Sequence, residues 1–189
     1  MKNIAIFASG NGSNFEAIVS AVQAGEINAS VSLLVCDKPG ARVISRAESH
    51  GIETFAFMPK GYADKAAYEA EILDRLQAAG VQFMVLAGYM RLISKTLLAA
   101  YPERIINIHP SLLPHFPGKD AIGQAYRSGA RETGVSVHYV DEGMDTGPVI
   151  AQRTVEIKAG DTLETLEQNI HRVEHALYIQ TLKELFREG

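Results

Sequence analysis

The residues best suited to chemistry in this sequence are an amide and an imidazole two positions apart, Asn107 and His109. Alternate side chains of a strand point to the same face, so both project together from the apolar stretch around them. Pro110 follows directly, and a central strand does not continue through proline. His109 is therefore expected at the carboxyl end of its strand, where open parallel sheets bind ligands. A donor beside an acid/base group at this edge indicates acyl chemistry, although two hydrogen-bonded polar residues at an ordinary strand end are the alternative.

A carboxylate for this pair is available in the acidic turn of residues 141–145. Brought beside His109, it would stabilise the protonated imidazole. A solvated acidic turn is the alternative. Asp145, Thr146 and Gly147 also match the signature of aspartic proteases, whose paired carboxylates share a proton. Those proteins are all-β, whereas this chain alternates strands and helices, so that class is disfavoured.

A second candidate site is the sequence Ser-Gly-Asn-Gly-Ser-Asn at residues 9–14, between an expected strand and an expected helix. Glycines permit tight turns, and a helix amino terminus presents unpaired N–H groups to an anion. The dinucleotide fingerprint needs a third glycine where Phe15 stands, so NAD is disfavoured even though Asp37 lies near the position of a ribose-binding acid. A phosphate-bearing small molecule fits better, and a plain strand-to-helix turn is the alternative.

A third pattern is His171, Glu174 and His175, which matches the H-x-x-E-H motif of inverted zinc proteases. Histidines four apart share a helix face and suit zinc. That chemistry needs a third ligand from farther along, where little sequence remains, so we expect no metal, although an upstream ligand is compatible with the spacing. Glu174 borders the apolar stripe of its helix. It is expected to be either an edge residue or a ligand for a cationic group.

Alternating elements must position these groups. Short apolar runs predict buried strands, apolar residues three and four apart predict helices, and glycine or proline separates them. The expected strands are 4–8, 31–36, 54–57, 83–87 and 104–108, then an antiparallel hairpin of 135–140 and 149–157. The expected helices are one after residue 14, 41–49, 64–79, 94–100 and a long final helix with a capping box of Asp161 and Glu164. The pattern predicts an α/β fold, with a Rossmann-like, mostly parallel sheet covered by helices on both faces.

Composition limits the remaining classes. The chain has 189 residues, 47% hydrophobic and 21% charged, which suits one domain spanning 1–189. A net charge of -4 gives no general basic field for nucleic acid. Cys36 is the only cysteine and lies in an apolar run, so we expect a buried structural thiol. We also expect a cytoplasmic, soluble protein with neither a signal peptide nor a membrane partner.

Four motifs, in this order, resemble the phosphoribosylglycinamide formyltransferase family, the folate-dependent transformylases of purine synthesis. They are Gly-Asn-Gly-Ser-Asn at 10–14, Leu-Ala-Gly-Tyr-Met-Arg at 86–91, Asn-Ile-His-Pro-Ser-Leu-Leu-Pro at 107–114 and Asp-Thr-Gly-Pro at 145–148. The resemblance implies the formyltransferase fold, with a phosphate-binding half of about 1–100 and a catalytic and folate half of about 101–189. It implies transfer of a formyl group from 10-formyltetrahydrofolate, as cosubstrate, to the amine of glycinamide ribonucleotide. It implies no metal, and a monomer or a homodimer.

The same resemblance assigns roles to residues. Asn107, His109 and Asp145 look like the catalytic trio. The residues expected against glycinamide ribonucleotide are Gly12, Ser13 and Asn14 at its phosphate, and His171, Arg172, Val173 and Glu174 near its amine. The expected folate pocket consists of Lys65, Met90, Arg91, Leu92, Ile93, Asn107, Asp141, Glu142, Gly143, Met144 and Asp145. Lys65 falls at an anion contact, to folate or to phosphate. The loop 111–122 is expected to act as a lid that excludes water.

Three alternatives remain open. One is a related folate-dependent formyltransferase, such as the methionyl-tRNA enzymes, which carry an additional carboxy-terminal domain that we do not expect here. Another is a formyltetrahydrofolate hydrolase, whose additional amino-terminal domain is likewise not expected. The last is a nucleotide-binding module without catalysis, which would not need Asn107, His109 and Asp145 together.

Overall fold

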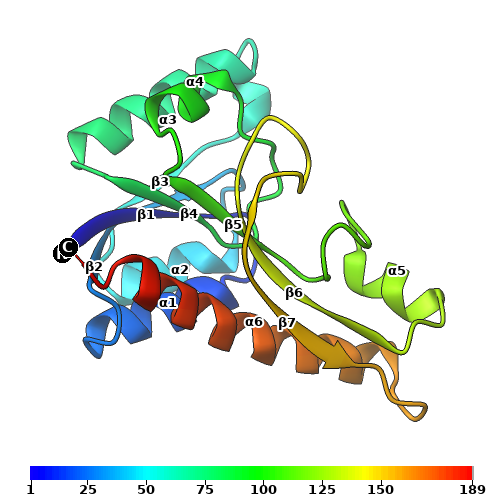
Figure 1. Ribbon diagram of the computed structural model, residues 1–189. Helices are drawn as coiled ribbons and strands as arrows, with labels where there is room; N and C mark the ends of the chain where they lie inside the picture. Colours follow the sequence, from blue (N-terminus) through cyan, green and yellow to red (C-terminus); the bar gives the residue numbers. More distant parts are fainter. Residues whose placement is uncertain (189) are drawn as a thin grey trace.

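The computed structural model describes residues 1–188, which fold around one seven-stranded sheet (Figure 1). The strand order is β3-β2-β1-β4-β5-β6-β7. The first five strands are parallel, whereas β6 runs antiparallel to β5 and β7 antiparallel to β6. The strands are β1 (Lys2–Ala8), β2 (Ala29–Cys36), β3 (Thr54–Ala56), β4 (Phe83–Leu86), β5 (Ile105–His109), β6 (Glu132–Tyr139) and β7 (Val149–Glu156). The predicted fold class, with its carboxy-terminal antiparallel hairpin, is confirmed.

Helices cover both faces of the sheet (Figure 1). The helices are α1 (Ser13–Gln23), α2 (Arg42–Ser49), α3 (Lys65–Ala78), α4 (Lys95–Ala100), α5 (Ala121–Arg127) and α6 (Leu163–Leu185), with a 3-10 turn η1 (Pro59–Gly61). Successive strand residues alternate between the faces. In β1, Ile4 and Ile6 join the core with α1, α2 and α6, whereas Ala5 and Phe7 join the core with α3 and α4. Both cores are apolar and buried, so the sheet is a rigid platform for the loops at its edge.

The topology creates a crevice between β1 and β4. From β1 the chain moves outward to β2 and β3, and β4 then returns to the opposite side of β1. The loops after β1 and β4 therefore diverge, which is the arrangement at which open α/β sheets bind ligands. Tyr178 of α6 is fully buried, and its hydroxyl donates to the Leu86 carbonyl at 2.7 Å. This hydrogen bond fixes α6 beneath the end of β4, close to the crevice.

Two expectations about local structure need correction. The capping box of α6 is formed by Thr162 and Thr165 instead of Asp161 and Glu164. The reason is that Asp161 belongs to the preceding turn, where its carboxylate accepts from the Lys158 N–H at 2.8 Å. The loop expected over 111–122 ends two residues early, because α5 begins at Ala121.

Two other expectations, the end of β5 and the burial of Cys36, agree with the structure. β5 ends at His109, as the following proline predicted. Cys36 is fully buried in the sheet, as expected for a structural thiol. Within residues 1–188, no helix combines the length and the apolar character needed to cross a membrane.

Candidate active site

A cleft of about 860 Å³ opens at the carboxyl edge of the sheet. Pockets for small molecules are commonly of this size. Its walls come from the loop after β1, the loop after β4, the end of β5, the loops beside it and α6. The predicted site residues that line it are Gly12, Ser13, Asn14, Met90, Arg91, Leu92, Ile93, Asn107, His109, Gly143, Met144, Asp145, His171 and Glu174. Segments from both halves of the sequence thus meet in one cleft.

Five predicted residues lie outside this lining: Lys65, Asp141, Glu142, Arg172 and Val173. The Lys65 ammonium donates to the Leu92 carbonyl at 2.8 Å, so it supports the loop after β4 from behind. Asp141 organises its own turn, because its carboxylate accepts from the Gly143 N–H at 3.0 Å and from the Thr146 hydroxyl at 2.6 Å. Arg172 points to solvent on α6.

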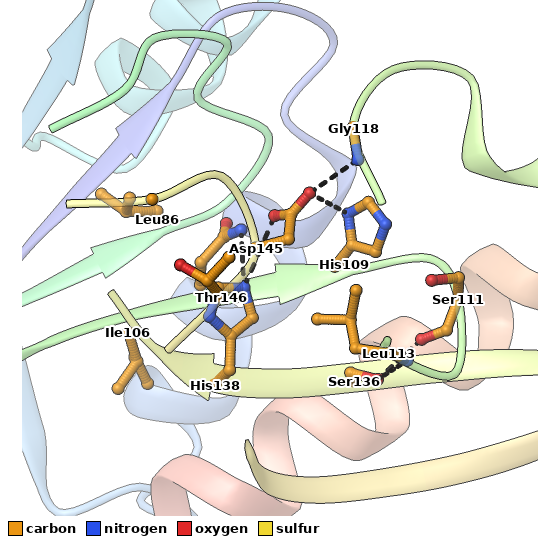
Figure 2. Close-up of polar contacts among 12 residues, drawn as sticks. Leu86, Ile106, His109, Ser111, Leu113, Gly118, Ser136, His138, Asp145 and Thr146 are labelled. Carbon is orange, nitrogen blue, oxygen red and sulfur yellow. Dashed lines mark hydrogen bonds and ion pairs between the residues drawn. The ribbon is translucent and has the colours of Figure 1, made fainter. Parts of the chain in front are cut away.

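The predicted trio is brought together by the pairing of β5 with β6. Asn107 and His109 lie two apart on β5, and their cross-strand partners on β6 are His138 and Ser136. Opposite residues of an antiparallel pair share a face, so His138 lies against Asn107. Figure 2 shows the Asp145 carboxylate above this face, between the two imidazoles. One Asp145 oxygen lies 3.4 Å from His109 Nδ1 and the other 3.7 Å from His138 Nε2.

Asp145 is held firmly by the loop between β6 and β7. Its backbone adopts a left-handed conformation (φ 56°), which aspartate tolerates better than most residues. Gly147 is packed so tightly that an added Cβ would lie 1.8 Å from the Tyr139 carbonyl oxygen. Burial acts to raise the pKa of the Asp145 carboxyl, but contact with His138, the hydrogen bond from the Gly118 N–H (2.8 Å) and the histidine charges outweigh it. The pKa of Asp145 therefore lies below its ordinary value, and the group is a carboxylate at neutral pH.

His109 is surrounded by hydrogen-bond acceptors. Its Nδ1 faces the Asp145 carboxylate, and its Nε2 lies 2.9 Å from the Phe116 carbonyl oxygen. A carboxylate and a carbonyl both only accept, so the imidazolium, with a proton on each nitrogen, is the form that satisfies both. The His109 side chain is 7% exposed, so its contact with the Asp145 carboxylate is shielded from water. The arrangement suits a group that donates a proton or a hydrogen bond.

His138 is a site residue that the sequence interpretation missed. Its Nδ1 donates to the Tyr139 carbonyl at 2.8 Å, which directs Nε2 at Asn107 Nδ2, 3.3 Å away. When His138 is neutral it accepts from the Asn107 amide, and when protonated it donates toward Asp145. The signal in the sequence was the alternation of polar Ser136 and His138 on one face of β6. Its meaning depends on the register with β5, which the sequence does not reveal.

The loop after β1 and helix α6 form the other end of the cleft. Gly12 has φ 81°, a conformation that glycine adopts without strain, and it leads into the amino terminus of α1. The Asn14 amide donates to the Glu174 carboxylate at 2.8 Å, and His175 Nε2 lies 3.2 Å from the Ser13 hydroxyl. Among residues 1–188, the buried Asn14 Oδ1 has no hydrogen-bond partner. An acceptor beside a carboxylate suits an amine or another cationic donor.

The two histidines of the H-x-x-E-H pattern have separate partners. His171 Nδ1 lies 3.4 Å from the Glu174 carboxylate, and His175 contacts Ser13. A hydrogen bond with Glu174 raises the pKa of His171, whereas burial lowers the pKa of His175. In the described part of the chain, no cluster of three or more His, Cys, Asp or Glu side chains has the arrangement of a metal site.

Asp37 has a structural use that differs from the ribose contact considered for it. Its buried carboxylate accepts from the Ser9 hydroxyl and, at 2.8 Å, from Arg91 Nε. The same Ser9 oxygen accepts from the Met90 N–H at 2.9 Å. Asp37 therefore ties the loop after β4 to the loop after β1. Met90 and Met144 are 74% and 48% exposed at the cleft, so they offer apolar surface to a ligand.

Comparison with known proteins adds independent support for one family. Residues 2–182 match the family described as "Formyl transferase". A phosphoribosylglycinamide formyltransferase of Bacillus subtilis (strain 168) is 60% identical over 185 residues, covering 98% of this chain and 95% of that protein. The Escherichia coli (strain K12) protein of the same name is 37% identical, covering 93% and 83%. The crystal structure of glycinamide ribonucleotide transformylase 1 from Geobacillus kaustophilus is 61% identical with a TM-score of 0.96, covering 98% and 99%.

Proposed function

The chain belongs to the formyl transferase family, and we propose that it transfers the formyl group of 10-formyltetrahydrofolate to the amine of glycinamide ribonucleotide. The products are formylglycinamide ribonucleotide and tetrahydrofolate, in the de novo synthesis of purine nucleotides. The observation that carries this proposal is the cleft, where the glycine loop before α1, the Glu174 carboxylate, and the group of Asn107, His109 and Asp145 meet. The names of the relatives, which match over nearly the whole chain, agree with it.

The acceptor fits the end of the cleft formed by the loop after β1 and by α6. Backbone N–H groups at the start of α1, with Ser13, provide donors for its phosphate. Glu174 and Asn14 Oδ1, which has no hydrogen-bond partner among the described residues, offer acceptors for its amino group. Hydrogen bonding to Asn14 and Glu174 would hold the amine with its lone pair directed at the formyl carbon, which is the alignment that the attack requires.

The folate fits the other end, between Met90 to Ile93 and the loop that carries Asp145. The loop after β4 offers backbone groups, and the exposed Met90 and Met144 offer apolar surface. Lys65 lies outside the lining of the cleft. We propose that it supports the loop after β4, through the Leu92 carbonyl, and does not bind the cosubstrate directly.

Attack of the amine on the formyl carbon produces a tetrahedral intermediate with a negative oxygen. The Asn107 amide nitrogen carries two N–H groups, and its contact with His138 uses one. The second N–H and the His109 imidazolium are the donors that would stabilise this oxygen. The C–N bond to the folate then breaks, and the proton lost by the amine is delivered to the departing nitrogen, with Asp145 and His109 as the groups that relay it.

His109 needs one of its present contacts to open before it can donate to the substrate. The contact with Phe116 is a backbone carbonyl in the loop between β5 and α5. Phe116 has a left-handed backbone (φ 51°), which is unfavourable for a bulky residue. We propose that substrate binding exchanges this carbonyl for the formyl oxygen, and that residues 110–120 then cover the reacting groups. Exclusion of water favours transfer over hydrolysis.

We also propose a single domain over 1–189, because the phosphate-binding and catalytic halves contribute strands to one sheet. The proposed setting is the cytoplasm, with small-molecule substrates, no metal, no nucleic acid and no membrane partner, and a monomer or homodimer. Size-exclusion chromatography with light scattering distinguishes the two assembly states.

An absorbance assay for tetrahydrofolate tests the proposed function. The purified protein is mixed with 10-formyltetrahydrofolate and either glycinamide ribonucleotide, another amine or no acceptor. We expect product only with glycinamide ribonucleotide. Turnover with another amine would support a related formyltransferase, and turnover without an acceptor would support a hydrolase. No turnover with any acceptor would support a binding module, and each of these results would overturn the proposal.

A further inference from the structure

The glycine loop (residues 9–12) is supported from behind by α2, a helix whose residues do not appear in the cleft lining. Arg46 on α2 makes two hydrogen bonds to Asn11. Its Nε donates to the Asn11 backbone carbonyl at 2.8 Å, and its Nη2 donates to the Asn11 side-chain oxygen at 2.7 Å. A planar guanidinium binds two acceptors at once in a fixed geometry, so this contact restricts both the backbone and the side chain of Asn11.

The neighbouring residues of the loop also rest on α2. The Val43 N–H donates to the Gly10 carbonyl at 3.0 Å. An added Cβ on Gly12 would lie 2.6 Å from Val43 Cγ2, closer than real Cβ contacts allow. Three consecutive loop residues therefore touch one turn of α2. The packing leaves the loop no room to move toward the helix.

Arg46 is itself held by α1. Its Nη1 lies 3.7 Å from one oxygen of Glu16, and His50 Nε2 lies 2.8 Å from the other. Glu16 belongs to the first turn of α1, and its N–H donates to the Gly12 carbonyl at 2.9 Å. The Arg46 side chain is 23% exposed, so the guanidinium is a partly buried link between α2, the loop and α1.

This link sets the direction of a backbone donor. In a trans peptide the carbonyl oxygen and the following N–H point in opposite directions. Because Arg46 holds the Asn11 carbonyl toward α2, the N–H of Gly12 points away from α2. Gly12 lines the cleft, so its N–H is available there to an anion.

We propose that Arg46 is a positioning residue for the phosphate of the acceptor: it fixes the Asn11–Gly12 peptide so that the loop N–H groups are arranged before the phosphate arrives. This inference rests on the proposed function, since it assigns the anion at this loop to the acceptor. Arg46 acts through Asn11 and does not touch the substrate.

The experiment compares Arg46→Gln and Arg46→Lys with the matched control Arg42→Gln. Arg42 is exposed on the same helix and carries the same charge. The rate is measured with glycinamide ribonucleotide and with its unphosphorylated riboside, and binding of inorganic phosphate alone is measured by calorimetry. Hydrogen bonds to charged groups are strong enough that Arg46→Gln should raise KM for the phosphorylated acceptor by about tenfold or more.

A positioning role for Arg46 predicts which kinetic and binding constants change and which do not. Arg46→Gln should leave kcat, KM for 10-formyltetrahydrofolate and the rate with the riboside unchanged, and should weaken inorganic phosphate binding. Arg46→Lys keeps the charge but loses the two-point contact, so it should resemble Arg46→Gln. Arg42→Gln should resemble the parent protein.

Three outcomes overturn the inference. If Arg46→Lys has the KM of the parent for the phosphorylated acceptor, charge alone matters. If Arg46→Gln loses the same activity with both acceptors, Arg46 has a general structural role. Arg46→Gln that binds inorganic phosphate as the parent does would mean no role in the phosphate subsite. Failure of the proposed function gives a different result, because the parent protein would then convert neither acceptor. Binding of inorganic phosphate by the variants would still test the role of Arg46.

Discussion

Gly12→Ala is the substitution whose effect the structure defines most closely. Gly12 adopts φ 81°, and its missing Cβ would lie 2.6 Å from Val43 Cγ2 and 2.7 Å from Val43 Cβ. A residue with a side chain pays roughly 1–2 kcal/mol for the left-handed conformation. Overpacking of a close-packed contact adds about 1–3 kcal/mol. The expected cost is therefore about 2–5 kcal/mol, part of which the loop relieves by moving away from α2.

That movement should damage one substrate site selectively. The loop N–H groups would be displaced from the acceptor phosphate, so KM for glycinamide ribonucleotide should rise by about tenfold or more, which corresponds to at least 1.4 kcal/mol. KM for 10-formyltetrahydrofolate should stay near that of the parent, since the folate end of the cleft is built from other loops. Steady-state kinetics with each substrate varied in turn measures both constants.

Gly129→Ala is the matched control. Gly129 also has a positive φ (74°), but an added Cβ there meets nothing within 4 Å among residues 1–188. It should lower the free energy of unfolding by about 1–2 kcal/mol, or Tm by about 2–8 °C for a chain of this size, without changing either KM. If Gly12→Ala keeps the parent KM for the acceptor, or if both variants raise this KM equally, the glycine loop does not position the acceptor.

Three further predictions concern the reacting groups and the loop beside them. Asn107→Ala removes a donor to the oxyanion, so it should lower kcat by about 10²–10³-fold with little change in either KM. A large change in KM with unchanged kcat would contradict this role. Asp145→Asn removes the carboxylate that stabilises the His109 imidazolium, so the remaining activity should require lower pH, and a pH–rate profile that superimposes on that of the parent would contradict it. Shortening the loop of residues 115–119 should raise the ratio of formate release to formyl transfer, measured by product analysis, and an unchanged ratio would rule out its role as a lid.

The pKa of Asp145 also predicts how stability depends on pH. Because this pKa lies below the ordinary value in the folded protein, Asp145 contributes stability above the ordinary carboxyl pKa, and this contribution is lost as the pH falls through the lowered value. Urea denaturation at a series of pH values from 7 to 3 should therefore show a steeper loss for the parent than for Asp145→Asn. Equal losses would contradict the sign of the shift.

The sequence alone predicted those features of the structure that depend on residues close together in the chain. Pro110 ended β5 at the predicted histidine, and the spacing of Asn107 and His109 fixed their common face. The alternation of apolar runs and helical patterns was sufficient to predict the sheet and five of its helices, but not the short helix α5, which begins inside the predicted loop. The cap of α6 was wrong by one residue because Asp161 and Thr162 are both good caps, and the choice depends on the turn before them.

The sequence alone did not predict contacts between residues that lie far apart in the chain. His138 meets Asn107 through a strand register, Asp37 meets Arg91 across 54 positions and Arg46 meets Asn11 across 35. None of these pairs has a local pattern. Lys65 and Asp141 were expected at the folate by resemblance to the family, and in the structure their side chains hold the loops around them. The roles of all the predicted site residues stay predictions.

The fate of the formyl carbon distinguishes transfer to the acceptor amine from hydrolysis. Glycinamide ribonucleotide is incubated with 10-formyltetrahydrofolate labelled with ¹³C in the formyl group, and products are quantified by mass spectrometry. We expect one labelled formyl group on the acceptor amine for each tetrahydrofolate formed, and almost no labelled formate. Label recovered mainly as formate, or tetrahydrofolate formed at the same rate without the acceptor, would contradict it.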